Sequence, residues 1–436
     1  MRITVIGCGY LGATHAACMA ELGHEVLGVE VDADKLKLLS SGTAPVFEPG
    51  LSELLDKHVS SGRLRFSDSY EEAAVFGDVH FLCLGTPQKS FGLAADTSYL
   101  DSAVRSLAPL LTGPALVVGK STVPVGTAPV LAELLTSLAP AGTDVHLAWN
   151  PEFLREGLAV QDTLAPDRLV MGIVDPADER LLREVYAAPI AGGTPVVVTD
   201  FATAELVKVS ANAFLATKIS FINAIAEVCD ATGADVVDLA DALGYDARIG
   251  RRFLNAGIGF GGGCLPKDIR AFVHRAGELG VEDAMRFLRE VDLINQRRRE
   301  HVVELATAML GPLSGARVSV LGAAFKPDSD DVRDSPALWV AGQLHMRGAD
   351  VRVHDPQAMP NARRMFPTLT YLDDPVATCE GTDLVLHLTE WPVYRELDPV
   401  ALASVVARPA IIDGRNCLDP TVWRAAGWDL RALGRR

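Results

Sequence analysis

A single cysteine, Cys264, follows three consecutive glycines in the segment GFGGGCLPKD, which spans residues 259–268. A metal site would need further cysteine or histidine ligands at short spacing, and neither occurs in the next few positions. The thiol is therefore either a filler in a loop or a nucleophile. The glycines before it would let backbone amides face a substrate.

The residues around Cys264 favour the nucleophile. Pro266 is typical of the first turn of a helix, which places Cys264 at a predicted helix N-terminus. The helix dipole and Lys267 would both lower the pKa of a thiol there. Asp268 lies four residues beyond the cysteine, which suits a thiol and a carboxylate that act in sequence. Cysteines in apolar segments are expected to be inert core residues instead: Cys8, Cys83 and Cys229.

A glycine pattern, GCGYLG, lies at the end of the first predicted strand and opens a helix, with Gly7, Gly9 and Gly12 in the GxGxxG positions. Glu30 ends the next predicted strand. The glycines would let a pyrophosphate approach the helix N-terminus, and the acid would accept hydrogen bonds from an adenosine ribose. This context favours a dinucleotide site over a merely tight turn. A carboxylate would also repel a 2′-phosphate, so NAD is favoured over NADP, although Lys35 weakens that preference.

Polar residues interrupt a long apolar helical stretch, LVKVSANAFLATKI. Lys208 and Asn212 are four residues apart and share a helix face with Glu205. Such groups are costly to bury without partners. Two interpretations are equally open: a functional cluster and a partly solvated stripe.

Three further segments follow predicted strands, at the edge where sheets of this kind bind ligands. STVPVGT (121–127) offers the hydroxyls of Ser121 and Thr122. NPEFLREG (150–157) carries two acids and Arg155, although such loops also commonly start helices. FKPDSDDVRDSP (325–336) carries Lys326 and Arg333, which suggest a second phosphate-bearing ligand rather than a purely structural repeat.

The elements that position these residues form an α/β chain. Strand-like runs alternate with helical segments up to about residue 200, which predicts a doubly wound, mainly parallel sheet. Helical segments, the first about 30 residues long and without proline, then continue to about residue 311. A second, smaller βαβ region follows from Arg317. The predicted domains are 1–200, 201–311 and 312–436.

Composition narrows the possible partners. With 436 residues and 49% hydrophobic residues, the chain can bury several cores. Its net charge of −16 argues against nucleic acid and anionic membranes as partners. Seven scattered cysteines without CxxC spacing suit a reducing cytoplasm. No apolar run near about 18 residues is apparent, so neither a signal peptide nor a membrane span is expected.

Taken together and in order, these motifs and the late DGRN resemble the UDP-glucose/GDP-mannose dehydrogenase family over nearly the whole chain. The resemblance implies an N-terminal Rossmann domain that binds NAD, a central helical region that forms a homodimer, and a C-terminal Rossmann-like domain that binds a nucleotide sugar. It also implies oxidation of UDP-glucose to UDP-glucuronate with two NAD, through a cysteine thiohemiacetal and thioester. GFGG at 259–262 is more similar to the UDP-glucose branch than to the GDP-mannose branch.

The resemblance also assigns roles to residues. Cys264 would be the nucleophile, and proton transfer and hydrolysis would be supported by Lys208, Asn212, Glu152, Thr122 and Asp268. NAD would be bound by Gly7, Gly9, Tyr10, Leu11, Gly12, Glu30, Lys35, Thr86, Pro87, Ser121, Thr122, Glu156, Lys267 and Arg333. The nucleotide sugar would be bound by Glu152, Phe153, Leu154, Arg155, Glu156, Lys208, Asn212, Asn255, Gly257, Gly259, Phe260, Gly261, Phe325, Lys326 and Arg415. Arg248 would reach in from the partner subunit, and no metal is expected.

Some positions depart from the common family pattern, and other functions compete. Glu30 stands where the family usually has aspartate, CLGTP replaces a more usual V-x-TP, and Gly263 replaces a serine. The alternatives are a dTDP-glucose or GDP-mannose dehydrogenase, a two-electron β-hydroxyacid dehydrogenase and, from another class, a silent NAD-binding scaffold. The β-hydroxyacid enzymes have no use for Cys264 or for a C-terminal domain.

Overall fold

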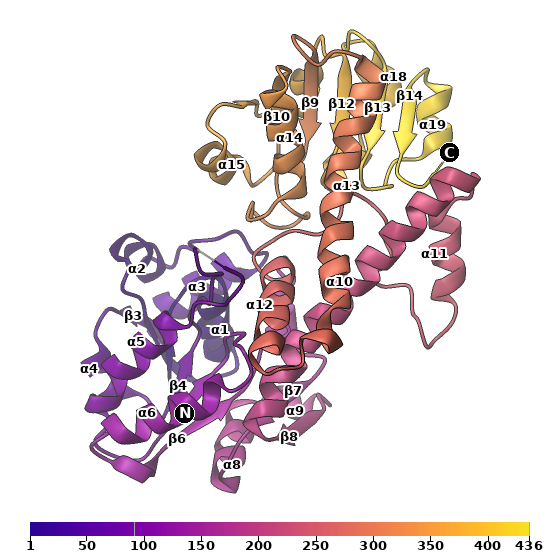
Figure 1. Ribbon diagram of the computed structural model, residues 1–436. Helices are drawn as coiled ribbons and strands as arrows, with labels where there is room; N and C mark the ends of the chain where they lie inside the picture. Colours follow the sequence, from indigo (N-terminus) through magenta and orange to yellow (C-terminus); the bar gives the residue numbers. More distant parts are fainter. Residues whose placement is uncertain (91, 436) are drawn as a thin grey trace. The chain divides into compact units, whose positions relative to one another are not determined.

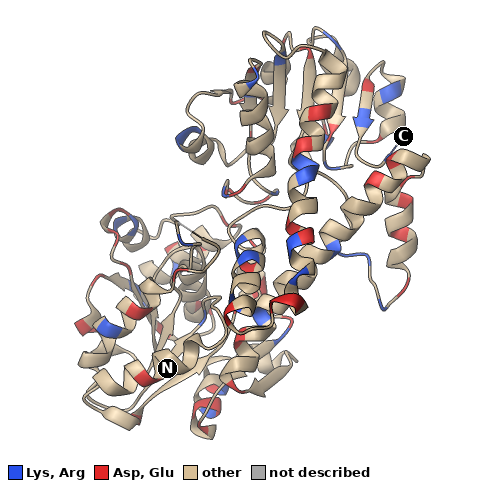
Figure 2. Ribbon diagram, in the orientation of Figure 1, with Lys and Arg blue, Asp and Glu red and all other residues tan. Residues whose placement is uncertain are grey.

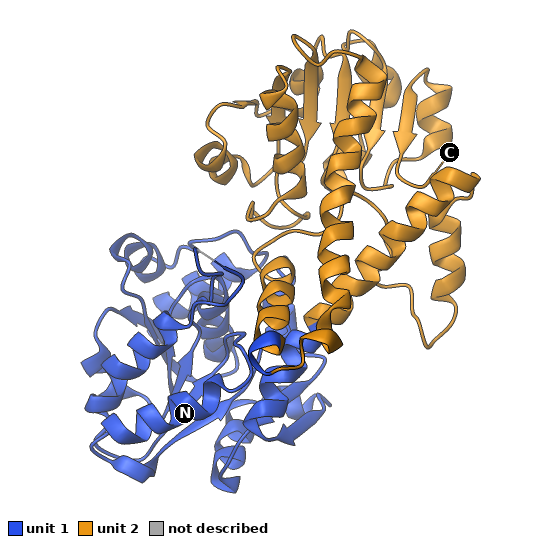
Figure 3. Ribbon diagram, viewed as in Figure 1, with its two compact units in different colours: residues 1–211, 277–279 blue, residues 212–276, 280–436 orange. Residues whose placement is uncertain are grey.

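The computed structural model describes residues 1–90 and 92–435. The chain divides into two compact units, one formed by residues 1–211 and 277–279 and the other by residues 212–276 and 280–436 (Figure 3). We call them unit 1 and unit 2. The three predicted domains, with boundaries after residues 200 and 311, stay a prediction.

Unit 1 is built on an eight-stranded sheet with the order β3-β2-β1-β4-β5-β6-β7-β8 (Figure 1). All neighbouring strands are parallel except β6 and β7, and the order reverses between β1 and β4. The predicted doubly wound sheet is therefore confirmed. The strands are β1 (Arg2–Ile6), β2 (Glu25–Val29), β3 (Leu64–Ser67), β4 (Val79–Leu82), β5 (Ala115–Gly119), β6 (Val145–Trp149), β7 (Leu169–Gly172) and β8 (Val196–Thr199).

Helices cover both faces of this sheet. In β1, Ile3 and Val5 belong to one buried cluster and Ile6 to another, so apolar side chains leave the sheet on both sides. The helices are α1 (Tyr10–Glu21), α2 (Ala33–Ser40), α3 (Leu51–Ser60), α4 (Tyr70–Phe76), α5 (Ser98–Leu107), α6 (Thr127–Leu138), α7 (Ala159–Leu164), α8 (Pro176–Val185) and α9 (Ala187–Ala191). Charged residues of both signs lie mainly on the helices and loops (Figure 2).

The helical region contains α10 (Phe201–Thr232), α11 (Val236–Gly244), α12 (Leu265–Glu278) and α13 (Phe287–Leu310). α10 runs from unit 1 into unit 2, and it starts where the Asp200 side chain accepts from the amide of Thr203 at 2.7 Å. By length and composition alone α10 could cross a membrane, so the expectation of no such apolar segment was wrong. Within its most apolar window 44% is buried in the fold, and a core helix of a soluble protein passes the same test.

Unit 2 contains a six-stranded parallel sheet with the order β11-β10-β9-β12-β13-β14. Val302, Val303 and Ala306 of α13 belong to the same buried cluster as Val318 and Val320 of β9. The strands are β9 (Arg317–Leu321), β10 (Asp350–His354), β11 (Thr370–Tyr371), β12 (Leu384–His387), β13 (Ala410–Asp413) and β14 (Asp429–Ala432). The helices are α14 (Pro336–Met346), α15 (Met359–Met365), α16 (Pro375–Cys379), α17 (Pro392–Arg395), α18 (Pro399–Ala403) and α19 (Pro420–Ala425).

Candidate active site

The turn after β1 has the geometry of a dinucleotide site. Gly7 has φ +86°, and a Cβ at Gly12 would lie 1.8 Å from the Gly7 carbonyl oxygen, so neither position accepts a side chain. Gly9 differs, because no heavy atom lies within 4 Å of its Cβ position. It caps α1, so the open space adjoins a helix N-terminus, where a pyrophosphate binds favourably. These residues fit the phosphates of NAD.

Glu30 directly follows β2 and is 7% exposed. Its two carboxylate oxygens accept from the amides of Cys8 at 3.2 Å and Asp32 at 3.0 Å. The negative charge is thereby fixed beside the glycine turn. Lys35, whose positive charge could attract a 2′-phosphate, forms an ion pair with Asp32 at 3.8 Å. The Asp32 carboxylate partly neutralises that positive charge. This arrangement fits a ribose that carries hydroxyls rather than a phosphate.

Hydroxyl groups connect the loops that follow β4 and β5. Thr86 donates from Oγ1 to the carbonyl oxygen of Thr122 at 2.7 Å. Ser121 donates from Oγ to the carbonyl oxygen of Leu84 at 2.6 Å. Three predicted site residues, with Pro87 next to one of them, therefore lie together at the carboxyl edge of the sheet.

The polar residues of α10 are buried. Glu205, Lys208 and Asn212 are 1%, 5% and 8% exposed, so the solvated stripe is excluded. Glu205 accepts from the amides of Gly126 at 2.7 Å and Ala128 at 2.6 Å, at the start of α6. It fixes the loop that carries Thr122, a role that the sequence did not reveal.

Lys208 and Glu152 form the central charged pair of unit 1. The Lys208 Nζ lies 3.0 Å from Oε1 of Glu152, and both side chains are largely buried. The other Glu152 oxygen accepts from the Leu154 amide at 2.7 Å. Two cations lie near the Phe153 ring, whose centroid is 3.7 Å from Cζ of Arg168 and 5.6 Å from Nζ of Lys208. A carboxylate and an ammonium group held in contact can exchange protons with a bound alcohol.

Arg155, in the same loop, binds within the fold. Its Nε and Nη2 donate to the Asp162 carboxylate at 2.9 Å and 2.6 Å, and its backbone amide donates there at 2.8 Å. The guanidinium fixes the loop to the first turns of α7. Its contact with a nucleotide sugar stays a prediction.

A buried cluster that sequence reasoning missed lies beneath these loops. Lys120 donates to Oδ1 of Asn150 at 2.9 Å and contacts the Tyr186 hydroxyl at 3.2 Å, and that hydroxyl donates to Asn150 at 2.7 Å. Burial lowers the pKa of Lys120 to about 8. Lys120 precedes Ser121, and Asn150 stands two residues before Glu152, so the cluster fixes both loops at their roots. Lys120, Tyr186, Glu152, Phe153 and Arg168 line one pocket.

In unit 2, Cys264 is exposed and directly precedes α12, as predicted. Its carbonyl accepts from the Asp268 amide at 3.0 Å, which starts the helix. The Asp268 carboxylate is 3% exposed and accepts from Nδ2 of Asn212 at 2.7 Å and from Nζ of Lys267 at 2.6 Å. Asn212 follows Lys208 by one turn on the continuous helix α10. Two of the predicted catalytic residues are thus in direct contact.

Of the three glycines before Cys264, Gly261 and Gly262 are required by close packing against residues 325–334, whereas a Cβ at Gly263 would meet the flexible end of the Arg333 side chain. A Cβ at Gly261, Gly262 or Gly263 would meet, respectively, the Asp334 carbonyl oxygen at 2.3 Å, the Phe325 ring at 2.9 Å and the Arg333 guanidinium at 2.3 Å. The Gly262 amide donates to the Arg333 carbonyl at 2.9 Å. The expectation that these glycines present amides to a substrate was therefore wrong for Gly262.

The preceding loop, residues 255–261, is anchored through its backbone. The Gly257 amide donates to Asn223 at 2.8 Å. Asn295 of α13 both accepts from the Phe260 amide at 2.7 Å and donates to the Phe260 carbonyl at 2.9 Å, and Arg299 donates to that carbonyl at 3.0 Å. The sequence did not reveal the three side chains that hold the loop. Asn255, a predicted contact of the nucleotide sugar, accepts from Arg251 at 2.7 Å.

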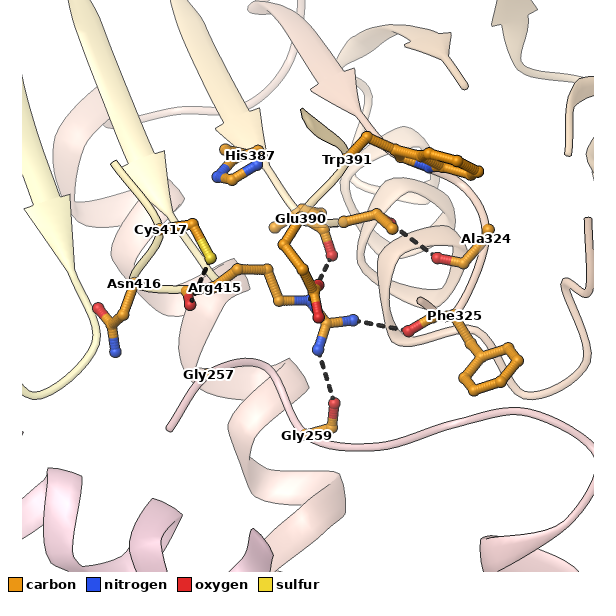
Figure 4. Close-up of polar contacts among 12 residues, drawn as sticks. Gly257, Gly259, Ala324, Phe325, His387, Glu390, Trp391, Arg415, Asn416 and Cys417 are labelled. Carbon is orange, nitrogen blue, oxygen red and sulfur yellow. Dashed lines mark hydrogen bonds and ion pairs between the residues drawn. The ribbon is translucent and has the colours of Figure 1, made fainter. Parts of the chain in front are cut away.

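Arg415 connects three predicted binding segments (Figure 4). Its guanidinium donates to the carbonyl oxygens of Leu388 at 2.8 Å, Gly259 at 3.1 Å and Phe325 at 2.9 Å. It also pairs with Glu390 at 3.1 Å. The DGRN arginine therefore lies among the segments where the sequence predicts the nucleotide sugar, and it orders them.

Three other predicted cations of unit 2 lie near its surface. Arg248 pairs with Asp246 at 2.6 Å, and its side chain is 89% exposed. Arg333 pairs with Asp331 at 2.7 Å. Lys326 places its Nζ 5.5 Å from the centroid of the adjacent Phe325 ring.

The other cysteines are poor nucleophiles. Cys8, Cys83 and Cys229 are buried, which bears out the expectation of core residues. Burial raises the pKa of the Cys83 thiol to about 12 and also raises the pKa of the Cys8 and Cys229 thiols. Cys264 is the one cysteine that is exposed within the described part of the chain.

Models of known protein families match the chain in three consecutive segments. Residues 1–190 match the NAD binding domain of the UDP-glucose/GDP-mannose dehydrogenase family, residues 202–297 its central domain and residues 319–420 its UDP binding domain. The chain belongs to the UDP-glucose/GDP-mannose dehydrogenase family. It is an NAD-dependent oxidoreductase of this family, and its substrate is a nucleotide sugar.

Individual members of the family align over the whole chain. It is 39% identical to UDP-glucose 6-dehydrogenase TuaD of Bacillus subtilis, covering 100% of this chain and 93% of the relative. It is 40% identical to UDP-glucose 6-dehydrogenase of Rhizobium meliloti, covering 100% of both. The UDP-glucose dehydrogenase structure from Pyrobaculum islandicum superposes with a TM-score of 0.92 at 39% identity, covering 100% of this chain and 98% of that one.

Proposed function

We propose that this dehydrogenase oxidises UDP-glucose to UDP-glucuronate, using two NAD for each sugar. Full-length similarity to proteins named UDP-glucose 6-dehydrogenase supports the substrate. The observation that carries the four-electron reaction is the exposed Cys264 at the start of α12, one turn before the buried Asp268. A two-electron dehydrogenase has no use for such a thiol.

The first oxidation converts the C6 alcohol to an aldehyde. The Glu152–Lys208 pair carries the proton chemistry: Glu152 accepts the hydroxyl proton, directly or through water, and Lys208 stabilises the developing alkoxide. Held at the glycine turn and Glu30, NAD supplies the hydride acceptor for both oxidations. Thr122 borders the same edge of the sheet through its bond with Thr86.

The second oxidation needs a tetrahedral carbon, because hydride loss from a free aldehyde would leave an unstable acylium cation. Cys264 adds to the aldehyde carbon and forms a thiohemiacetal, whose C–H then leaves as hydride to give a thioester. Water attacks the thioester, releasing the carboxylate and the thiol. Asp268, oriented by Asn212, accepts the proton of that water.

Counting NADH per nucleotide sugar tests the proposal. UDP-glucose, dTDP-glucose and GDP-mannose are each consumed to completion with excess NAD. We expect two NADH per UDP-glucose and a higher kcat/KM for it than for the other two sugars. One NADH per sugar would indicate a two-electron dehydrogenase, and none with any sugar would indicate a silent scaffold; either result overturns the proposal.

Two variants test the separate roles of Cys264 and Asp268. Asp268→Asn keeps the thiol but loses the carboxylate that assists hydrolysis, so a sugar-nucleotide adduct should accumulate and map to Cys264 by intact-protein and peptide mass spectrometry. Cys264→Ala should form no adduct. If Cys264→Ala still produced the acid with two NADH per sugar, the thiol would be only a filler.

We further propose a homodimer in which Arg248 serves the partner's site. Phe214, Phe221 and Val228 are 67%, 50% and 55% exposed and follow α10 at seven-residue spacing, an apolar stripe that suits a helix-to-helix interface. Mixing inactive Arg248→Ala with inactive Cys264→Ala protein tests the sharing. Hybrid dimers should recover part of the activity; no recovery after verified subunit exchange would refute the shared site.

A cytoplasmic location is part of the same proposal. None of the seven cysteines forms a disulfide in the structure, as suits a reducing compartment. Fractionation of the source cells should place the NADH-producing activity in the cytoplasmic fraction, and activity in the membrane fraction would contradict the proposal.

A further inference from the structure

Glu48 lies outside every sequence motif, between α2 and α3, and is only 4% exposed. Its two carboxylate oxygens accept from the backbone amides of Gly157 at 2.6 Å and Ala159 at 2.7 Å. More than a hundred residues separate it from these partners along the chain. Two such bonds hold the buried carboxylate in one position.

Tyr10 joins this contact from the other side. It is the first residue of α1, within the glycine turn that fits NAD. Its hydroxyl donates a short hydrogen bond to Glu48 and accepts from the Gly157 amide at 3.2 Å. Burial raises the pKa of Tyr10, and the bond to Glu48 raises it further, so the phenol stays protonated and remains a donor. The hydroxyl is thus directed at Gly157 and Glu48.

The segment that these two residues hold is the loop predicted to bind the nucleotide sugar. Gly157 ends this loop with φ +80°, a conformation in which its amide points to Glu48 and Tyr10. Near the other end of the loop, Glu152 accepts from the Leu154 amide and pairs with Lys208. The loop is therefore fixed at its start by the catalytic pair and at its end by Glu48.

We propose that Glu48 is a positioning residue for the nucleotide-sugar loop, and that Tyr10, although it belongs to the dinucleotide turn, serves the same loop through its hydroxyl. This inference rests on the proposed function. The positioning role of Glu48 differs from that of a simple cap for α7, because a cap would stabilise the fold without favouring the binding of one ligand over the other.

Separate binding constants distinguish these roles. Titration calorimetry gives the Kd of UDP-glucose without NAD and the Kd of NAD without the sugar, so no turnover occurs. We expect Glu48→Gln and Tyr10→Phe to weaken UDP-glucose binding by about three- to tenfold, the worth of one or two hydrogen bonds. NAD binding should change by less than about twofold, because the backbone of the glycine turn is intact.

Asp175→Ala is the matched control. Asp175 caps α8 in the same unit by accepting from the Ala177 amide at 2.7 Å, far along the chain from the site motifs. It should lower the Tm without changing either Kd. A double variant of Tyr10 and Glu48 should lose less affinity than the two single variants added together, because both act on Gly157.

Two results would overturn the inference. One is a loss of NAD affinity as large as the loss for the sugar; the other is a lowered Tm with both affinities unchanged, which would make Glu48 a cap only. Failure of the proposed function would appear instead in the wild-type protein, as an absence of UDP-glucose binding. The comparison would then use the nucleotide sugar that the substrate panel identifies, together with deuterium uptake at residues 153–159, which should rise in Tyr10→Phe.

Discussion

The first six strands of the sheet in unit 1 follow the same order as the six strands of the sheet in unit 2, but the two sheets differ in the turn after their first strand. In unit 1, β1 ends at Ile6 and α1 starts at Tyr10, so a helix N-terminus stands at the strand end. In unit 2, β9 ends at Leu321 and α14 starts only at Pro336, so a loop takes the place of the first helical turn. At the end of its first strand, unit 1 therefore offers a ligand backbone amides and a helix dipole. At the same place, unit 2 offers the side chains of a loop.

The backbone amides of the turn after β9 in unit 2 donate their hydrogen bonds within the protein. Ala323 and Ala324 donate to the buried Asp355 at 2.8 Å and 2.9 Å. Gly322 corresponds to Gly7, and both are crowded: a Cβ would lie 2.4 Å from Thr389 at Gly322 and 2.7 Å from Leu84 at Gly7. The position of Gly9, where the space is open, is occupied by Ala324 in unit 2. We infer that unit 1 binds phosphates through the main chain and that unit 2 binds them through the cations of its loops.

The largest expected effect comes from blocking the main-chain site. Gly12→Ala places a Cβ 1.8 Å from the Gly7 carbonyl oxygen, so we expect NAD affinity to fall about a thousandfold, roughly 4 kcal/mol, by calorimetry. UDP-glucose should still bind, because its phosphates are expected to contact the loops of unit 2. Gly113→Ala is the control, because nothing lies within 4 Å of that Cβ position. Unchanged NAD binding would remove the main-chain half of the comparison.

The second effect concerns the side-chain site. Arg415→Lys keeps the charge but cannot span three carbonyl oxygens, so UDP-glucose affinity should fall about fiftyfold, roughly 2 kcal/mol, while the Kd of NAD stays the same. Arg424→Lys, whose guanidinium reaches only the Leu430 carbonyl, serves as the control. An equal loss of NAD affinity would contradict a division of labour between the units.

Buried ionisable groups lie at the ends of two corresponding strands, Lys120 after β5 in unit 1 and Asp413 at the end of β13 in unit 2. In unit 2, burial alone would raise the pKa of Asp413 at the end of β13, but His387 holds it below its usual value. In unit 1, Lys120 follows β5 and donates hydrogen bonds to the neutral side chains of Asn150 and Tyr186. Burial lowers its pKa to about 8, although the Glu152 carboxylate acts in the opposite direction. The buried carboxylate is hydrogen-bonded to a histidine ring in one sheet, and the buried ammonium group is hydrogen-bonded to neutral side chains in the other.

The unfolded chain holds the Lys120 proton up to its ordinary pKa, and the folded chain loses it near pH 8, so stability should rise with pH between these values. From pH 7.5 to 9.5, urea unfolding of the wild type should gain up to about 2 kcal/mol relative to Lys120→Met. Parallel pH profiles for the two proteins would show that Lys120 keeps an ordinary pKa.

The smallest expected effect concerns the ribose. Glu30→Gln removes the charge that repels a 2′-phosphate but retains one acceptor oxygen, so the ratio of kcat/KM for NAD to that for NADP should fall about fivefold, roughly 1 kcal/mol. Glu25→Gln at the exposed start of β2 should leave the ratio unchanged. A wild type with comparable kcat/KM for both cofactors would already contradict the role of Glu30.

The fold was largely predictable because most strands are apolar runs between turn residues. β1, RITVI, has four buried positions in succession, and this apolar run predicts a strand. The missed strands lack this signal: β3 reads LRFS, β11 has only two residues, and β14 reads DLRA with two charged side chains. They pair as strands because a neighbour offers a free edge, which no local pattern encodes.

The site was predictable where chemistry and position lie within one motif. The positions of Cys264 and Asp268 at a helix start and of Glu30 at a strand end were predicted that way, and their roles stay predictions. Glu48 and Arg299 could not, because their partners lie 109 and 39 residues away and their types are ordinary for a surface. The sequence also did not reveal why Gly261 must be a glycine, because the reason is its close packing against the distant carbonyl of Asp334.

Because only one cysteine is exposed among residues 1–90 and 92–435, the number of intact active sites in a preparation can be measured by titration with a thiol reagent. Burial raises the pKa of the thiols of Cys18, Cys379 and Cys417 to about 12, as it does for Cys83. An alkylating reagent at neutral pH therefore meets one reactive position in each folded chain, Cys264. The number of equivalents consumed before activity disappears gives the fraction of competent sites in a preparation, without a radiolabel or an engineered tag.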